Sequence, residues 1–408
     1  MKASTLKLSL PVIALTAQQS AVSLAIPPFL QDLGFPVVAI GSLISLGPFL
    51  ALAARIPTGL AYRAARARLL IVLALLIVSL CDFLYTFAAH PVIFALVHSV
   101  NGFALGAATT LYLAFFMEAL PQDENRHHAM GIYMGCLAVG HSSGSFLAGA
   151  IADRFGYPAT FQTAAFLALL CAAVLVIFLR RPDSLEHQEN RPGPPAFTSL
   201  RNSLRAVAEP EMASVVVVAL FLNVLHQMGS VFLPLYGLAV GLTLTQIGII
   251  KGLYALCNSI ARPLSGFVVN RMGSQKRLCQ IGLTIQAVFL MLVPLCSDFG
   301  PLLTVFLLLA LMRAVVVVSN AISLVQDVDQ TRLPRGLTSG IFNAAGDLGN
   351  ILGPSAGGLI GAVVGVAGLF VFGPLSAVLL FMIVFQGIRL LPRSPVPDVK
   401  INLKPPAN

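Results

Sequence analysis

Charged residues are scarce in this chain of 408 residues. Asp, Glu, Lys and Arg together make up 10% of it, hydrophobic residues make up 57%, and the mean hydropathy is +0.88. Soluble domains carry about 25% charged residues. The shortage of charge therefore excludes an ordinary soluble protein and indicates a chain that crosses a membrane several times.

Tryptophan is absent, and the six cysteines are scattered in or beside apolar runs at positions 81, 136, 171, 257, 279 and 296. Their spacing argues against disulfides and metal ligands, so no metal site is predicted. The chain also lacks a Gly-x-x-x-x-Gly-Lys loop for the phosphates of ATP, so ATP-driven pumping would need another subunit. The Gly-x-Ser-x-Gly pattern at residues 140–144 lies inside an apolar run, outside the strand-turn-helix context of a hydrolase, and no enzyme is predicted.

Apolar runs long enough to cross a bilayer, which takes about 20 helical residues, occur twelve times. They cover residues 8–31, 38–61, 69–88, 92–119, 129–152, 158–179, 212–238, 244–269, 278–296, 301–325, 336–360 and 366–390. Turn residues separate the runs, as in DLGFP at 32–36 and RFGYP at 154–158. We predict an all-α membrane protein with twelve transmembrane helices.

The distribution of Lys and Arg predicts the orientation of the chain. With the N-terminus in the cytoplasm, 22 of the 25 Lys and Arg residues fall at cytoplasmic ends or loops, as the positive-inside rule requires. The net charge of +9 then reflects contact with anionic lipid, and no nucleic-acid partner is expected. Both termini are therefore predicted to be cytoplasmic.

The longest polar interruption, residues 180–211, separates six apolar runs from six. It is rich in Pro, Arg and Glu, which is typical of a linker. We predict an N-terminal six-helix bundle (1–179), a cytoplasmic linker (180–211), a C-terminal six-helix bundle (212–392) and a cytoplasmic tail (393–408).

The two halves repeat each other. Residues 40–59 align without a gap with residues 247–266, which pairs Gly41 with Gly248 and Arg55 with Arg262. Residues 126–149 align in the same way with residues 335–358, and the paired glycines there include Gly140 with Gly349, Gly144 with Gly353 and Gly149 with Gly358. Two similar bundles can rock about a site between them, and small residues let helices approach closely at the surfaces that slide. We therefore predict two pseudo-symmetric bundles and a transport function.

The loops after the second and eighth runs resemble a signature of the major facilitator superfamily, Gly-x-x-x-Asp-Arg-x-Gly followed by basic residues. The second copy departs in having Asn for Asp, and its matching positions are Gly266, Asn270, Arg271 and Gly273. The first copy is degenerate: it keeps Gly59, has Tyr62 near the Asp position, and continues with Arg63. The resemblance covers the whole chain and implies the fold of that superfamily, a gating role for these loops and a functional monomer.

A second likeness concerns direction. The stretch GPSAGG, which begins with Gly353 and Pro354, is similar to the antiporter signature of the superfamily. The family carries that signature on its fifth helix, whereas this chain carries it on the eleventh. It favours export by antiport over uptake by symport by a small margin. On the fourth helix, His98 stands where the family often has Arg.

Polar side chains inside apolar runs are costly in lipid and are therefore candidates for function. The resemblance implies a cavity lined by helices 1, 4, 7 and 10 and flanked by helices 2, 5, 8 and 11. The predicted substrate site contains Gln18, Gln19, His98, Asn101, Asn223, His226, Gln227, Lys251 and Arg313. Gln18 and Gln19 are neighbours on a helix, so at most one of them faces the cavity squarely.

Asp347 is interpreted as the only carboxylate deep inside a run, and two roles for it are open. It either forms a structural salt bridge with Arg313 on the neighbouring helix or binds and releases a proton, a role that His98 could share. Lys251 and Arg313 against Asp347 leave one positive charge in surplus, which favours an anionic substrate. The absence of Trp weakens a sugar or a cationic drug as the substrate.

These observations predict a secondary transporter of the bacterial inner membrane that moves a small organic anion by alternating access. A proton or ion gradient supplies the energy, and no cofactor is expected. Proton-coupled uptake of an anionic metabolite or metal chelate is the first alternative. A membrane sensor or scaffold that kept the fold without transport is the alternative of another class.

Overall fold

The fold was taken from a computed structural model, which describes residues 3–60, 62–120, 126–178, 210–271, 274–331 and 335–390. Residues 180–209 of the predicted linker, the predicted tail, Gly273 and the side chain of Asn270 lie outside the described part of the chain.

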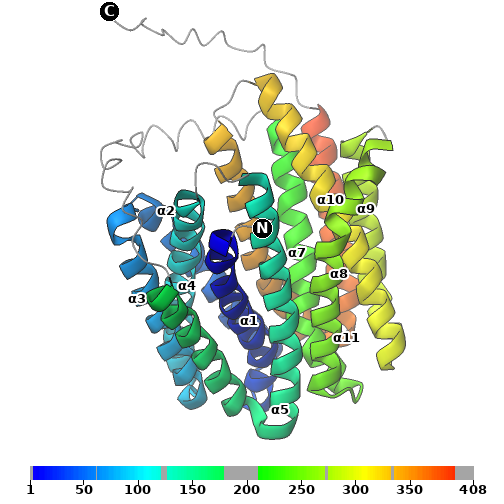
Figure 1. The fold of residues 1–408 in the computed structure, drawn as a ribbon. Helices are drawn as coiled ribbons and strands as arrows, with labels where there is room; N and C mark the ends of the chain where they lie inside the picture. The colour runs from blue at the N-terminus through cyan, green and yellow to red at the C-terminus, as the bar shows by residue number, and fades with distance from the viewer. Residues whose placement is uncertain are drawn as a thin grey trace, which may run out of the picture.

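Helices make up all the regular structure in these described ranges. The α-helices are α1 (Ala3–Asp32), α2 (Val37–Leu60), α3 (Ala64–Leu84), α4 (Pro91–Ala119), α5 (Arg126–Phe178), α7 (Pro210–Ala239), α8 (Leu244–Arg271), α9 (Gln275–Met291), α10 (Phe299–Thr331) and α11 (Arg335–Leu390), with short 3-10 helices η1 (Tyr85–Phe87) and η3 (Val293–Leu295). Hydrocarbon offers no water to satisfy backbone groups, so apolar runs of this length fold as helices. Figure 1 shows them side by side, with α2, α3 and α4 on one side and α8, α9 and α10 on the other.

Two of the helices, α5 and α11, each consist of two helical segments joined at a bend. α5 bends at Gly156 (φ 78°) and α11 bends at Gly365 (φ 76°), and a positive φ is strained for any residue with a side chain. Nine helices in the described residues are long and apolar enough to span a membrane, and the two bent ones among them raise the number of crossings to eleven. α8, which carries Lys251, Arg262 and Arg271, supplies the twelfth. The prediction of twelve transmembrane helices is confirmed.

The two bundles have the same internal arrangement. α1 packs against α5 in the first half as α7 packs against α11 in the second, and α2 packs against α4 as α8 packs against α10. The bends at Gly156 and Gly365 fall at equivalent places of the two halves. The predicted repeat is therefore a repeat of structure.

The bundles meet along two seams, α2 against α11 and α5 against α8. A Cβ atom built on Gly41 would lie 2.9 Å from the Cα atom of Gly358, and one built on Gly248 would lie 3.3 Å from the Cα atom of Gly149. Real Cβ atoms do not approach other atoms as closely as the first distance. Repeat-related glycines thus let the backbones cross at both seams, because packing must hold helices together where lipid supplies no hydrophobic drive.

The other repeated glycines have a different place from the one expected. Gly140 and Gly144 pack against α1, and Gly349 and Gly353 pack against α7; a Cβ atom on Gly353 would lie 2.8 Å from the carbonyl oxygen of Val224. These four glycines therefore tighten each bundle from within and do not lie at the sliding surfaces. Pro354 does lie at a seam, where its carbonyl oxygen faces Gly41.

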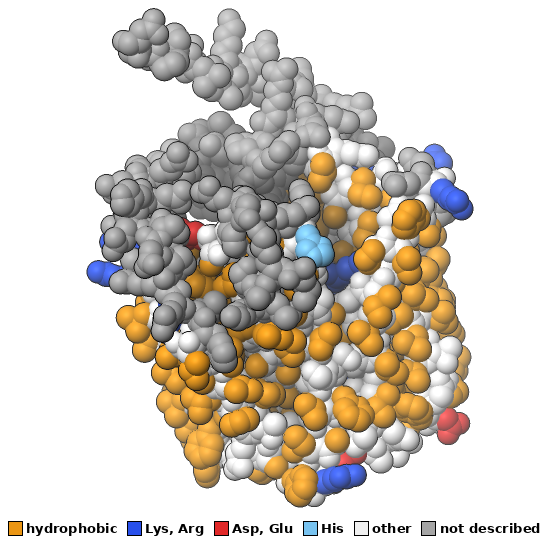
Figure 2. Space-filling model, in the orientation of Figure 1, with side chains coloured by type: hydrophobic (Ala, Val, Ile, Leu, Met, Phe, Trp, Pro, Cys, Tyr) orange, Lys and Arg blue, Asp and Glu red, His pale blue; other side chains and the backbone are white. Residues whose placement is uncertain are grey.

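The outer surface is apolar. Phe267, Leu295 and Val363 expose 73%, 79% and 85% of their surface, and Figure 2 shows hydrophobic side chains over most of the visible face, with charged ones mainly toward its upper and lower ends. A continuous apolar surface of this extent marks contact with lipid. The chain is a multi-pass membrane protein.

Candidate functional site: a cationic cavity between the bundles

A cavity of about 430 Å³ lies between the two bundles, within the range of about 300–1,000 Å³ that small-molecule sites occupy. α1 and α5 line it from the first bundle, and α7, α8, α9 and α10 from the second. None of the described residues of α2, α4 or α11 is part of its wall. The cavity is therefore displaced toward the α5–α8 seam, and the expectation that helix 4 lines it is wrong.

The wall of the cavity is cationic. Lys251, Arg262 and Arg313 line it together with His141 and His226, and the described lining residues include no Asp or Glu. Three cationic side chains against no carboxylate make a larger surplus than the single charge expected from the sequence. Low-dielectric walls strengthen such a field, which favours a negatively charged occupant.

Hydrogen bonds hold two of the cations in place. The Arg313 guanidinium donates from Nη1 to the carbonyl oxygen of Leu222 and from Nη2 to Oδ1 of Asn223, both at 2.9 Å. The Lys251 ammonium donates to the carbonyl oxygen of Ser230 at 3.2 Å and to Oγ of Ser23 at 3.4 Å. Since Ser23 is on α1 and Ser230 is on α7, Lys251 contacts both bundles at once.

The third cation is less completely bonded. The Nε atom of Arg262 and the Oδ1 atom of Asn258 are buried without a hydrogen-bond partner among the described residues. Both residues line the cavity. Buried polar atoms normally have partners, so a donor and an acceptor are free at this wall for a ligand or water.

The rest of the wall contains both polar and apolar side chains. Aliphatic and aromatic side chains face the cavity from α7, α9 and α10, among them Leu225, Leu233, Leu290, Phe306 and Leu309. His226 stacks on Tyr254 with ring centroids 5.4 Å apart and planes 13° apart, and its Nδ1 atom lies 3.1 Å from the Tyr254 hydroxyl. Such a surface suits the carbon skeleton of an organic molecule.

The structure divides the sequence-predicted substrate residues into two groups. Gln19, His226, Gln227, Lys251 and Arg313 line the cavity, and Asn223 stands behind it as the partner of Arg313. Gln18, His98 and Asn101 are buried inside the N-terminal bundle instead. His98 lies against Tyr85, whose hydroxyl is 2.7 Å from Nδ1, because α4 faces α2 and α3 rather than the cavity.

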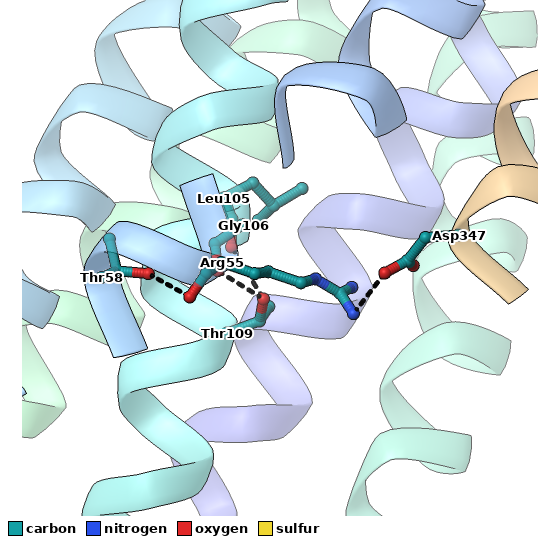
Figure 3. Close-up of polar contacts among 6 residues, drawn as sticks. All are labelled: Arg55, Thr58, Leu105, Gly106, Thr109 and Asp347. Atoms are coloured by element: carbon teal, nitrogen blue, oxygen red, sulfur yellow. Dashed lines mark hydrogen bonds and ion pairs between the residues drawn. The ribbon is translucent and has the colours of Figure 1, made fainter. Parts of the chain in front are cut away.

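Asp347 does not pair with Arg313. Its carboxylate lies 2.8 Å from the guanidinium of Arg55, which reaches across from α2 to α11 (Figure 3). The expected partner was wrong because α10 barely touches α11, whereas α2 packs along it, and Arg313 points at α7. The ion pair thus joins the two bundles along the α2–α11 seam, away from the cavity.

Comparison with known proteins places this architecture in a family. The model of the Major Facilitator Superfamily matches residues 8–354. The chain belongs to the major facilitator superfamily. An uncharacterized MFS-type transporter of Methanocaldococcus jannaschii is 20% identical to it over 362 residues, which cover 88% of this chain and 92% of that protein.

Two solved structures have the same superfamily fold. A bacterial homolog of the human lysosomal transporter Spinster, inward-facing and unoccupied, matches with a TM-score of 0.76 at 15% identity, over 95% of this chain and 96% of that one. The nucleoside transporter NupG matches with a TM-score of 0.77 at 13% identity, over 96% and 100% of the two chains. Likeness at this level of identity concerns the fold of the superfamily.

The degenerate first copy of the facilitator signature is hydrogen-bonded to the end of α4. Tyr62, which stands near the usual Asp position, donates a hydrogen bond of 2.5 Å to Oε2 of Glu118 at the end of α4. Burial, and then the neighbouring Glu118, raise the pKa of the Tyr62 phenol, which keeps it a donor. Arg63 precedes α3, and Arg271 ends α8. In the described part of the chain, nothing outside their own helices lies within 4 Å of a Cβ atom built on Gly59 or Gly266.

One buried acid was missed in the sequence. Asp82 on α3 is fully buried and accepts hydrogen bonds from Nε2 of Gln18 at 2.7 Å and from Nδ2 of Asn101 at 2.9 Å. Because Asp82 is six residues from the end of its apolar run, it was assigned to the run's periphery. The sequence did contain a signal for this buried acid: Gln18 and Asn101 are amides inside other apolar runs, and each needs a polar partner there.

Proposed function

We propose that this facilitator moves a small organic anion across the membrane by alternating access. The observation that carries the proposal is the charge of the cavity: Lys251, Arg262 and Arg313 line it, and its described wall has no carboxylate. Arg and Lys bind carboxylates and phosphates through charge-assisted hydrogen bonds. An anion would also neutralise cations that are otherwise costly at this depth in the membrane.

The shape and lining of the cavity support an organic anion of moderate size. Its volume of about 430 Å³ exceeds the needs of an inorganic ion, and the apolar side chains of Leu225, Leu290 and Phe306 in its wall suit a carbon skeleton. The unpaired Arg262 Nε and Asn258 Oδ1 atoms add a donor and an acceptor that fix orientation. We assign the charged end of the substrate to the three cations and its carbon skeleton to the apolar wall.

The energy source, direction and orientation are part of the same proposal. A proton gradient drives transport, both termini are cytoplasmic in the bacterial inner membrane, and the monomer is the functional unit. The Gly353-Pro354 stretch favours export by antiport over uptake, and Pro354 of this stretch lies on the α2–α11 seam. The basic cytoplasmic loops support the orientation.

A stability screen in detergent or lipid nanodiscs tests the anion proposal. A ligand that binds only the folded state raises the unfolding temperature, and the rise grows with the ratio of its concentration to its Kd. The panel contains carboxylates and phosphate esters, each with the amine and the uncharged amide or alcohol of the same skeleton. We expect stabilisation by members of the anionic set alone. Stabilisation by the amines in preference to the anions would contradict the assigned charge of the substrate.

A further inference from the structure

Asp82 is the one fully buried carboxylate of the described residues, and the proposed transport route does not use it. It lies inside the N-terminal bundle between α1, α3 and α4. No Lys or Arg forms an ion pair with it among the described residues, in contrast to Asp347. An ionised carboxylate in this position has no counter-ion, which makes its charge expensive.

The groups around Asp82 suit both of its protonation states. The amide donors of Gln18 and Asn101 stabilise the ionised form, whereas complete burial stabilises the neutral form. The titratable neighbours are Cys81 on α3, Tyr85 on η1 and His98 on α4, which is hydrogen-bonded to Tyr85. None of these neighbours is a permanent cation, so no fixed charge holds Asp82 in the ionised state.

The side chain of Gln18 supplies a second, independent observation. Its Oε1 atom is buried without a hydrogen-bond partner, while its Nε2 atom donates to Asp82. The two ends of a carboxamide are nearly equal in size, so half a turn about the last torsion exchanges them. After that turn, Oε1 faces Asp82 and accepts the O–H bond of a protonated carboxyl group. The orphan oxygen is thus the acceptor that the neutral form of Asp82 needs.

The position of Gln18 connects this site to the cavity. The next residues along α1, Gln19 and Ser20, line the cavity, and Ser20 lies 2.6 Å from Ser145 of α5 through their hydroxyl groups. Ser23, one turn further, accepts from Lys251. A change at Gln18 therefore acts on the same helix that holds the cavity wall and contacts the second bundle.

We propose that Asp82 is a proton-binding site, with Gln18 as the amide that switches between donating to the carboxylate and accepting from the carboxylic acid. The proton is transferred from a hydronium ion: one O–H bond of the hydronium breaks, the O–H bond at Oδ2 of Asp82 forms, and a neutral water molecule is released. Because Asp82 is sealed in the present structure, exchange with water takes place in another conformation of the transport cycle. The inference rests on the proposed proton coupling and places its site at Asp82 instead of Asp347.

Infrared difference spectroscopy of the purified protein in lipid, titrated across the neutral range, reads the protonation of buried carboxyl groups without any substrate. We expect a carbonyl band of a protonated carboxylic acid that disappears as the pH rises. The band should be absent in Asp82→Asn and retained in the matched control Asp347→Asn. If Asp82→Asn folds poorly, Asp82→Glu should keep a titrating band at an altered frequency.

A titrating band that persists in Asp82→Asn, or the lack of any titrating carboxyl band in the wild type, overturns the assignment. The same preparation is used for the anion screen, which separates the two proposals. Anion binding without titration of Asp82 overturns the proton site alone, whereas titration without anion binding supports the proton site and overturns the proposed substrate class.

Discussion

Arg55 of α2 lies 2.8 Å from Asp347 of α11 and so ties the two bundles together along one seam (Figure 3). The repeat partner of Arg55 is Arg262, and the position equivalent to Asp347 on α5 is occupied by Ala138. Arg262 consequently has no carboxylate opposite it and lines the cavity, as Ala138 does. One departure from the repeat thus makes a latch on one side of the molecule and a cationic site on the other.

The latch predicts a conformational effect. Asp347→Asn removes the charge of the pair and should shift the protein toward states in which α2 and α11 separate, while Arg55→Gln should give the same shift. We expect the exchanged pair, Arg55→Asp with Asp347→Arg, to restore part of the wild-type distribution. Distances between spin labels on the two bundles measure the shift. Equal distance distributions in the wild type and both single variants would show that the ion pair does not affect the equilibrium between conformations.

The cationic wall predicts a loss of anion affinity. Lys251→Met and Arg313→Met each remove charge-assisted hydrogen bonds of about 1.5–3 kcal/mol, so the Kd of an anionic ligand from the stability screen should rise about ten- to a hundredfold. Titration calorimetry measures the change. Arg154→Met, at an exposed position outside the cavity and outside the signature loops, is the control and should leave the Kd unaltered.

The repeat makes a complementary prediction. Ala138→Asp places a carboxylate opposite Arg262, at the position that Asp347 has opposite Arg55. The new acid should pair with Arg262 and weaken anion binding, whereas the uncharged Ala138→Asn should weaken it less. An unaltered affinity in Ala138→Asp would place Arg262 outside the binding site.

The glycines at the seams predict a steric effect. Gly248→Val on α8 would press a side chain into α5, because even a Cβ atom would lie 2.5 Å from the carbonyl oxygen of Ser145. Gly266→Val is the matched control on the same helix, since no described atom beyond the neighbouring backbone of α8 lies within 4 Å of its Cβ position. We expect Gly248→Val to lower the unfolding temperature strongly and Gly266→Val to lower it only by the helix-propensity cost common to both. Similar behaviour of the two variants would contradict tight packing at this seam.

A second contact across the α5–α8 seam lies at the N-terminal end of α8 and predicts how this end of the seam opens. Asp153 of α5 accepts hydrogen bonds from the backbone N–H groups of Leu244 at 2.9 Å and Thr245 at 2.7 Å, and so caps α8 from the other bundle. Loss of such a cap costs about 0.5–2 kcal/mol. Asp153→Ala should therefore favour conformations with this end open, measured by alkylation of a cysteine introduced at Ser145. Asp298 is an exposed acid beside α10, and Asp298→Ala is the control. An equal alkylation rate in both variants would contradict the capping role of Asp153.

Much of the architecture could be predicted from the sequence, because bilayer thickness sets the length of each apolar run and the repeated glycines align the two halves. The direction in which a single side chain points could not be predicted from the sequence. Gln18 and Gln19 differ by one helical position, yet one bonds Asp82 and the other lines the cavity. Asp347 has its partner on a helix almost 300 residues earlier in the chain, and this choice depends on how the bundles dock. The sequence pairs Arg262 with Arg55, but Arg262 lines the cavity beside Ala138, where the repeat has no acid to match Asp347.

Counterflow in proteoliposomes tests the central claim most directly. Vesicles are loaded with the anion that stabilises the protein most in the screen, and uptake of its labelled form is followed in the wild type, Arg313→Met and empty vesicles, beside the matched amine. The account predicts saturable exchange of the anion in the wild type, strongly reduced exchange in Arg313→Met and none of the amine. Exchange of the amine, or binding of the anion without any flux, would contradict it, and the second result would identify a sensor that kept the facilitator fold.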